Sequence, residues 1–158
     1  MGEIFLLIFA NMIKNINIKK GKFIGQYVRL RNKYVGELMT HKVTIAGTLR
    51  WFANTDVEIY GITENEDLLG VVLIYIEKGN EIAFFVKKSG QGIGTRLLKI
   101  ADRIAKKRQL TQLWAWTKVE NIMAKRCFEK NGYIKQKRET REYQGEKIEG
   151  HHFVKNFI

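Results

Sequence analysis

The stretch that decides the fold is Ser89-Gly90-Gln91-Gly92-Ile93-Gly94-Thr95, a glycine-rich turn between two patterned segments. The segment before it, 81–86, is apolar and rich in strand-forming residues. The segment after it, 96–105, repeats apolar side chains at helical spacing. The first backbone N–H groups of a helix have no intrahelical partner, and the helix dipole attracts negative charge to them. We therefore expect an anion-binding site at this turn.

The composition is that of a single basic domain. A chain of 158 residues with 45% hydrophobic content can build one core. The formal net charge of +12 favours an anionic ligand or partner, which leaves a nucleotide cofactor, a nucleic acid and an acidic membrane surface open. Cys127 is the only cysteine, so an internal disulfide is excluded and a reducing cytoplasm is favoured. No metal-ligand spacing occurs, because the adjacent His151 and His152 would point to opposite faces of a strand.

The first residues differ from the rest of the chain. The apolar run at 4–10 is too short to span a bilayer, and only Glu3, an acidic residue, precedes it. A secretory signal would carry positive charge there. We therefore predict an N-terminal extension at 1–11, a domain at 12–158, no membrane span and a cytoplasmic location.

The remaining patterns give the order of elements. Strands are predicted at 13–19, 57–62, 69–77, 81–86, 110–117, 133–143 and 147–157. Helices are predicted at 22–39, 44–52, 93–108 and 121–130, with Thr44 and Asn121 as caps and with an interruption of the first helix near Asn32 or Gly36. Short polar turns between the strands of 57–86 predict antiparallel hairpins. The result is a mixed α/β domain with one sheet.

Two motifs in this order resemble the GNAT acetyltransferases. The family's R/Q-x-x-G-x-G/A turn, which binds the coenzyme A pyrophosphate, lies over residues 89–94. The family's N-x-x-A-x-x-x-Y-x-x-x-G-F motif lies over Asn121 to Tyr133. Glycine turns alone are weakly specific, but both motifs at the family's spacing are much more so. The resemblance covers 57–157 well and the earlier residues more loosely.

The resemblance implies a fold, an activity and a cofactor. The fold is a mostly antiparallel sheet of about seven strands, flanked by about four helices and splayed between the fourth and fifth strands. The activity is transfer of an acetyl group from acetyl-CoA to a primary amine by direct attack in a ternary complex, with no metal. The implied cofactor-binding residues are Phe85, Val86, Lys87, Ser89, Gly90, Gln91, Gly92, Ile93, Gly94, Thr95, Asn121, Ala124 and Phe128.

Two positions depart from the family pattern. Ser89 stands where Arg or Gln is usual, so a side-chain contact to the cofactor is lost while the main-chain donors remain. Phe128 stands where most members have the tyrosine that protonates the departing thiolate, and a phenyl ring has no proton to give. Its neighbour Cys127 points elsewhere on a helix and is interpreted as a packed residue. Water is then left to protonate the thiolate, or the thiolate leaves without an acid.

Glu81 is the predicted catalytic base. The run 81–86 resembles the strand of the histone-acetyltransferase branch whose glutamate deprotonates the amine, usually through water. The alternative is a solvated hairpin residue after Gly79-Asn80. The alternating Trp114 and Trp116 should share one face of their strand and pack there, and are not expected to stack nucleic-acid bases.

The acceptor stays open at this level. Arg29-Leu30-Arg31-Asn32, followed by the run from Thr44 to Trp51-Phe52, resembles members that acetylate amino-sugar nucleotides. Protein amines, aminoacyl-tRNA and polyamines are the alternatives, and the positive charge disfavours a polyamine. A catalytically inactive module that binds acetyl-CoA or nucleic acid is a further alternative, supported by Phe128 and Ser89. A homodimer also remains open.

Overall fold

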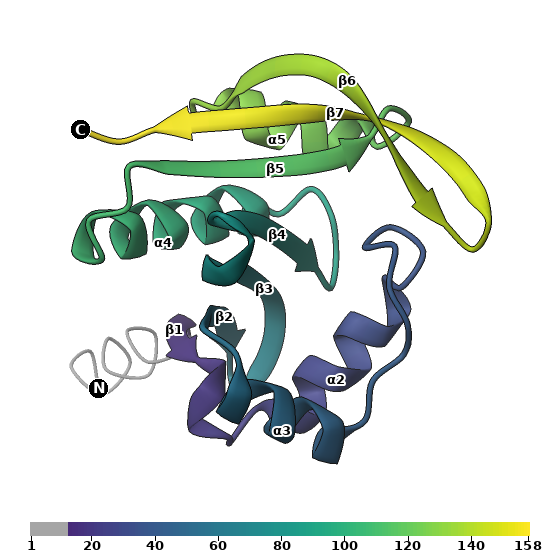
Figure 1. Cartoon of the computed structure of the whole chain (residues 1–158). Helices are drawn as coiled ribbons and strands as arrows, with labels where there is room; N and C mark the ends of the chain where they lie inside the picture. Colours follow the sequence, from purple (N-terminus) through teal and green to yellow (C-terminus); the bar gives the residue numbers. More distant parts are fainter. Residues whose placement is uncertain (1–12) are drawn as a thin grey trace.

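The computed structural model describes residues 13–158, which form one sheet with helices on both faces (Figure 1). The predicted extension at 1–11 lies outside the described residues. The strands are β1 (Ile13–Asn17), β2 (Val57–Glu64), β3 (Asp67–Tyr75), β4 (Glu81–Val86), β5 (Gln112–Lys118), β6 (Ile134–Tyr143) and β7 (Glu146–Asn156). The helices are α2 (Ile24–Lys33), α3 (Ile45–Asn54), α4 (Ile93–Lys107) and α5 (Ile122–Lys130), with short 3-10 turns η1 (Ile18–Lys20) and η2 (Ile76–Lys78).

The sheet confirms the predicted fold class. Its seven strands run in the order β1-β2-β3-β4-β5-β7-β6. All neighbours are antiparallel except β4 and β5, which are parallel. Only one residue pair, Glu81 with Trp114, joins β4 to β5. Beyond that pair the two strands separate, so the sheet consists of a β1–β4 half and a β5–β7 half with a gap between them.

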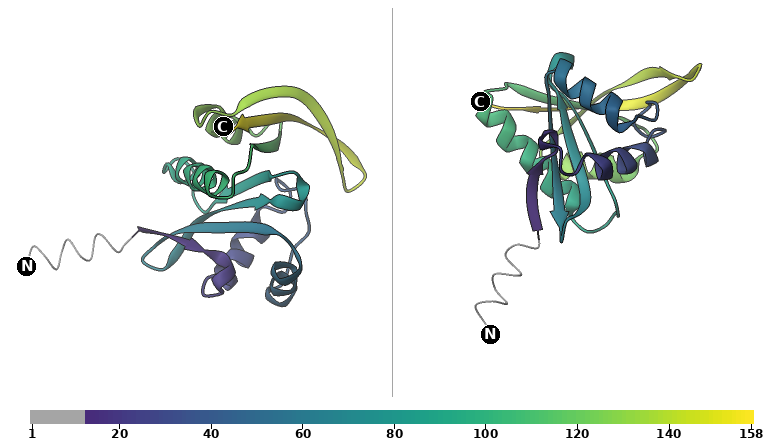
Figure 2. Two further views of the ribbon diagram at one scale, coloured as in Figure 1. Left: turned by 60° about the vertical axis from the view of Figure 1, so that its left-hand side comes forward. Right: turned by 90° about the horizontal axis from the view of Figure 1, so that it is seen from below.

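The two faces of the sheet carry separate cores. Helices α4 and α5 cover one face, and α2 and α3 cover the other (Figure 2). The helical pattern after the glycine turn explains the first core, since Leu97, Leu98 and Ala101 of α4 are fully buried in it. Tyr27 of α2 and Phe85 of β4 lie in the second core. Across residues 13–158, no helix is long and apolar enough to cross a bilayer.

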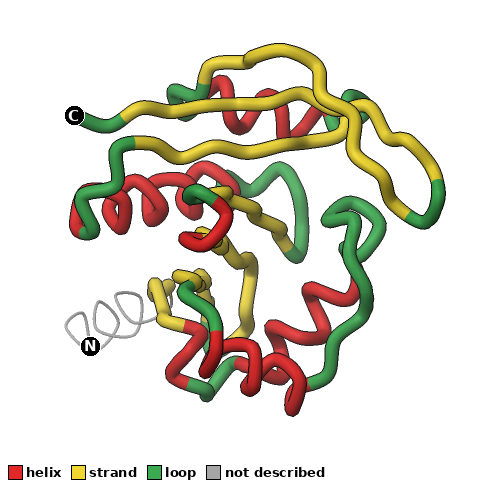
Figure 3. Tube along the Cα trace, in the orientation of Figure 1, coloured by secondary structure: helices red, strands yellow, loops and turns green. Residues whose placement is uncertain are grey.

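The end of one helix matters for the site. The helix expected at 22–39 ends at Lys33, beside the predicted interruption near Asn32 or Gly36, and the chain does not resume a helix but turns back through residues 34–44 (Figure 3). Asn32 fixes this turn, because its side-chain amide donates to the carbonyl of Val43 at 3.0 Å and its side-chain oxygen accepts from the Val43 N–H at 2.9 Å. We call residues 34–44 the α2–α3 segment.

Candidate functional site

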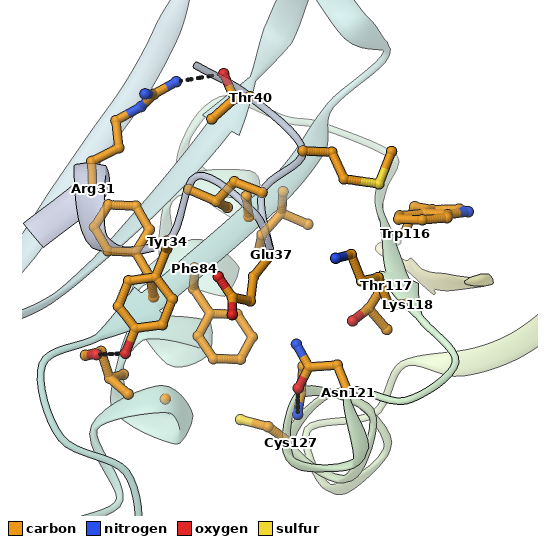
Figure 4. A pocket seen from close by; sticks show the side chains of 18 of the residues that line it. Arg31, Tyr34, Glu37, Thr40, Phe84, Trp116, Thr117, Lys118, Asn121 and Cys127 are labelled. Carbon is orange, nitrogen blue, oxygen red and sulfur yellow. Dashed lines mark hydrogen bonds between the residues drawn. The ribbon is translucent and has the colours of Figure 1, made fainter. Parts of the chain in front are cut away.

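A cleft of about 1480 Å³ opens where β4 and β5 separate. It is lined by the glycine turn, β4, β5, the start of α5, the α2–α3 segment and the tip of the β6–β7 hairpin. In Figure 4, Arg31, Tyr34 and Thr40 lie on one side and Trp116, Asn121 and Cys127 on the other, with Phe84 between them. Apart from Lys87, the cleft is lined by every residue that the sequence predicted for catalysis or cofactor binding, namely Glu81, Phe85, Val86, Ser89, Gly90, Gln91, Gly92, Ile93, Gly94, Thr95, Asn121, Ala124 and Phe128.

The glycine turn presents main-chain donors to this cleft. Gly90 and Gly92 have φ of 79° and 73°, in the left-handed region that favours glycine. A side chain at either position would meet nothing within 4 Å, so the turn is open on that side. Gly92 is the N-cap of α4 and supplies no side-chain hydrogen bond, so the first N–H groups of the helix remain available. This combination can bind an anion such as a phosphate.

The main chain of β4 offers unpaired groups to the gap, but only Val86 of the three predicted residues contributes to them. The N–H of Lys87 donates to the carbonyl of Leu69 at 2.7 Å, so Lys87 faces β3. Because main-chain groups alternate along a strand, Phe85 also faces β3, whereas Phe84 and Val86 face the gap. The prediction that the main chains of Phe85 and Lys87 offer free groups to the cofactor is therefore wrong. Its side chain also lies away from the cleft, in an ion pair with Asp67 at 2.8 Å.

Tyr34, in the α2–α3 segment, contacts the edge of β4 that has no neighbouring strand. Its hydroxyl donates to the carbonyl of Val86, and its ring stacks on Phe85 with centroids 5.8 Å apart. Burial raises the pKa of Tyr34, and the nearby charge of Glu37 adds to the shift. The hydroxyl therefore stays protonated and remains a donor inside the cleft. The sequence pattern marked Tyr34 only as part of a helix face.

Glu81 lies at the opposite end of β4 from the glycine turn. Its side chain is 15% exposed, and Oε1 accepts from Nη1 of Arg141 at 3.0 Å. The side chain of Glu81 is therefore largely shielded from solvent and held in an ion pair. The guanidinium of Arg141 lies over the rings of Trp116 and Trp114, at 4.8 and 5.5 Å from their centroids. The two tryptophans therefore share a face, as predicted, and that face holds the partner of Glu81.

The α2–α3 segment and the β6–β7 hairpin close the far end of the cleft. The hydroxyl of Tyr143, near the hairpin tip, donates to the carbonyl of Thr40 at 2.8 Å. Arg31 of α2 donates to the carbonyl of His41 at 3.0 Å and to the hydroxyl of Thr40 at 3.2 Å. The contact between Tyr143 and Thr40 joins residues more than a hundred positions apart, so no local sequence pattern could have revealed it.

Helix α5 forms the wall beside the glycine turn. Asn121 caps it as predicted, with Oδ1 accepting from the N–H of Ala124 at 3.2 Å. Phe128 is 4% exposed, lies edge-on to Phe84 at 5.3 Å and stacks on Phe153 at 5.5 Å. Burial raises the pKa of the Cys127 thiol. This wall is therefore mainly apolar, and Phe128 brings no proton donor to it.

Comparison with known proteins identifies the class of the chain. Residues 27–133 match the acetyltransferase (GNAT) family. No curated protein sequence matches the chain significantly. Among residues 13–158, no group of three or more His, Cys, Asp or Glu side chains is placed to hold a metal ion.

Solved structures share the fold at low sequence identity. The chain is similar to yncA, a putative acetyltransferase from Salmonella typhimurium solved with acetyl-CoA, with a TM-score of 0.78 and 16% identity, covering 92% of this chain and 94% of that one. An N-acetyltransferase from Staphylococcus aureus has a TM-score of 0.80 and 17% identity, with 91% and 98% covered. A Salmonella typhimurium enzyme that modifies the N-terminal serine of a 50S ribosomal subunit protein has a TM-score of 0.72 and 13% identity, with 94% and 96% covered.

Proposed function

Because the chain belongs to the GNAT acetyltransferase family, we propose that it transfers the acetyl group of acetyl-CoA to a primary amine by direct attack within a ternary complex. The observation that carries the proposal is the order in which functional groups line one cleft. It begins at an anion-binding turn, continues along the unpaired edge of β4 and ends at the carboxylate of Glu81. A long ligand with a pyrophosphate at one end and a reactive carbonyl at the other fits this order of groups.

The residues present fit acetyl-CoA. The main-chain N–H groups of 90–95 would hold the pyrophosphate, and the gap-facing groups of Phe84 together with the N–H of Val86 would hold the pantetheine arm. Asn121, Ala124 and Phe128 would line that arm from α5. Ser89 and Gln91 border the turn, where Ser89 replaces the longer side chain usual in the family. Lys87, which was predicted to bind the cofactor, is not part of this proposal because its main chain and side chain both face away from the cleft.

The chemistry needs few side chains. Acetyl-CoA supplies an acetyl group activated as a thioester. Glu81 takes the proton of the attacking amine, directly or through a water molecule, from its fixed place at the start of β4. The gap-facing N–H groups of β4 are the available donors for the developing oxyanion. Since Phe128 has no proton to give, the thiolate leaves unassisted or is protonated by water.

The acceptor class predicted from the sequence is an amino-sugar nucleotide, and the structure supports it in part. Arg31 and Trp51 from the resembling segments line the cleft, close to the α2–α3 segment. Arg29 is exposed and is not among the lining residues, and Asn32 is engaged with Val43. A protein amine is a second candidate, since one of the similar structures acts on a protein N-terminus.

The test is the release of free thiol from acetyl-CoA in the presence of amines. The panel contains amino acids, an amino-sugar nucleotide, a peptide with a free N-terminus, a polyamine and aminoacyl-tRNA. Thiol release that depends on one of these amines supports the proposal, and mass spectrometry of the product identifies the acetylated nitrogen. Calorimetric binding of coenzyme A without turnover on any amine would instead support the inactive module.

A further inference from the structure

The cleft contains a second charged group beside the proposed base. Arg141 projects from the β6–β7 hairpin, and its side chain is 32% exposed. Trp116 and Trp114 pack against its guanidinium, and Glu81 accepts one of its hydrogen bonds. The guanidinium is thus held in place from three sides. A cation so close to the reaction centre requires an explanation, because the proposed base does not need one to accept a proton.

Arg141 has donors left over after it binds Glu81. A guanidinium carries five N–H groups in a fixed plane. Within residues 13–158, the bond to Glu81 is the one hydrogen bond that the guanidinium of Arg141 makes. Since Arg141 lines the cleft, its remaining donors are available to a ligand there. A guanidinium edge with adjacent free N–H groups matches a carboxylate, which it binds through two parallel hydrogen bonds.

Aromatic side chains complete this part of the cleft. Tyr75 lies opposite Glu81 across the β3–β4 pair, and Trp51 lies against Tyr75 with ring centroids 6.0 Å apart. Both line the cleft, as does Tyr27, whose fully buried hydroxyl has no hydrogen-bond partner among the described residues. The side of the cleft next to the Glu81–Arg141 pair is therefore aromatic.

From this arrangement we infer that the acceptor is a free α-amino acid with an apolar or aromatic side chain. Its carboxylate binds the spare donors of Arg141, its amine faces Glu81, and its side chain packs on Trp51, Tyr75 and Trp116. The inference rests on the proposed acetyl transfer and names the substrate class of that same site. The amine and the carboxylate of an α-amino acid are attached to the same carbon atom. This spacing matches the carboxylate of Glu81 and the guanidinium of Arg141, which lie 3.0 Å apart.

Other amines match this pair less well. A peptide N-terminus has an amide in place of the carboxylate, so the donors of Arg141 would have no anion to bind. A polyamine would bring a second positive charge to Arg141. In a nucleotide sugar whose amine is on C4, the sugar ring separates the phosphates from the amine, so they could not reach Arg141 while the amine faces Glu81, and a phosphate is bulkier than the planar carboxylate that the guanidinium edge matches. The closeness of the two charges is what selects the α-amino acid.

The step balances without a further reactant. The amine nitrogen forms a bond to the thioester carbonyl carbon and its proton goes to Glu81, directly or through water. The carbon–sulfur bond breaks, and the thiolate leaves with the bonding electron pair and takes a proton from solvent. The products are an N-acetyl amino acid and free coenzyme A. Arg141 takes no proton in this step and acts by binding the carboxylate.

The experiment compares amino acids with their carboxamides. L-phenylalanine and L-leucine are tested against L-phenylalaninamide and L-leucinamide at saturating acetyl-CoA, with thiol release as the readout. We expect kcat/KM to be at least about tenfold higher for each acid than for its amide. The amides have the more easily deprotonated amines, so such a preference cannot arise from amine reactivity. Arg141→Gln should bring the ratio close to one, and Arg141→Lys should restore part of it.

A matched variant controls for the loss of a hairpin arginine. Arg138→Gln, on the same strand, breaks only an exposed ion pair with Glu149 and should leave the acid-to-amide ratio unchanged. Thermal unfolding checks that each variant is folded. If Arg141→Gln does not fold, the acid-to-amide ratio of the wild-type protein still tests the inference. The inference is overturned if wild type uses acid and amide equally, or if Arg141→Gln keeps the preference. It also fails, with the acetyltransferase proposal intact, if only the peptide, the tRNA or the amino-sugar nucleotide is acetylated. Thiol release with none of the amines overturns both.

Discussion

Gly150 lies directly against the indole of Trp116. A methyl group built on its Cα would come within 2.3 Å of two ring atoms and within 2.6 Å of the Thr117 carbonyl oxygen. Only a glycine on β7 allows β5 to bring Trp116 to the position where it contacts Arg141. Gly150, which does not line the cleft, thus positions the side chain of Trp116, which does.

Gly150→Ala should therefore lower both stability and activity. The methyl group must displace the indole or the β5 backbone, which we expect to reduce the free energy of unfolding by about 1–3 kcal/mol. Urea denaturation measures this loss, and KM for the acceptor should rise because Arg141 loses its support. Gly36→Ala is the matched control, since its new methyl group meets nothing within 4 Å and its φ is not positive. An unchanged unfolding midpoint in Gly150→Ala would contradict the role given to this contact.

Glu81→Gln tests the proposed base. We expect kcat/KM for the true acceptor to fall at least about tenfold, because the amide cannot take the proton of the amine. Glu149→Gln removes an exposed carboxylate on β7 and should leave the rate unchanged. Glu37 is the informative comparison, because its carboxylate also lines the cleft. A tenfold loss in Glu37→Gln, with none in Glu81→Gln, would assign the proton transfer to Glu37.

Phe128→Tyr tests whether a missing acid limits the rate. The new hydroxyl would restore the group that the family pattern has at this position, so kcat should stay equal or rise. The ring packs against Phe84, Tyr133 and Phe153, so the added oxygen should cost about 1 kcal/mol of stability. Steady-state kinetics beside thermal unfolding separates the two effects. A large fall in kcat in a folded variant would show that ring packing matters more than the absent proton.

His151 should make stability fall in mild acid. Burial lowers its pKa from 6.5, as do the charges of Lys125, Lys135 and Arg138, while Glu129 acts in the opposite direction. The unfolded chain then takes up a proton at a higher pH than the folded protein does. The stability from the neutral imidazole is therefore complete above about pH 6.5 and is lost as the pH falls below it. Unfolding free energies at pH 7.5 and pH 5 should converge in His151→Gln, while the exposed His41→Gln should behave like wild type.

The cofactor half of the cleft was predictable because its determinants are local. Glycines 90 and 92, the cap at Asn121 and the helical pattern of α4 each act within a few residues of their own position. The error inside this half concerns the main chain of β4. Whether the groups of Phe85 and Lys87 or those of Phe84 and Val86 face the gap depends on the register between β3 and β4, which the sequence of β4 alone does not contain.

The acceptor half was predictable only in part. Glu81 and the segments that contain Arg31 and Trp51 were named from the sequence, and all three residues line the cleft. Arg141 meets Glu81 across sixty positions of sequence, and Tyr34 meets Val86 across fifty-two, so no local pattern indicated these contacts. The interruption of the first helix was predicted near Asn32 or Gly36, but the contacts of Asn32 with Val43 that fix the turn were not.

The gap between β4 and β5 has a consequence for the fold as a whole. A sheet normally has edges only at its two sides, but this one has two more in its middle, where main-chain groups of β4 lack a neighbouring strand. An extended ligand bound in the gap would act as a substitute strand and would tie the two halves of the domain together. Such a ligand would add about 2.7 kcal/mol of stability at a hundred times its dissociation constant. Under the proposed function, the molecule that completes the sheet would be the one that the reaction consumes.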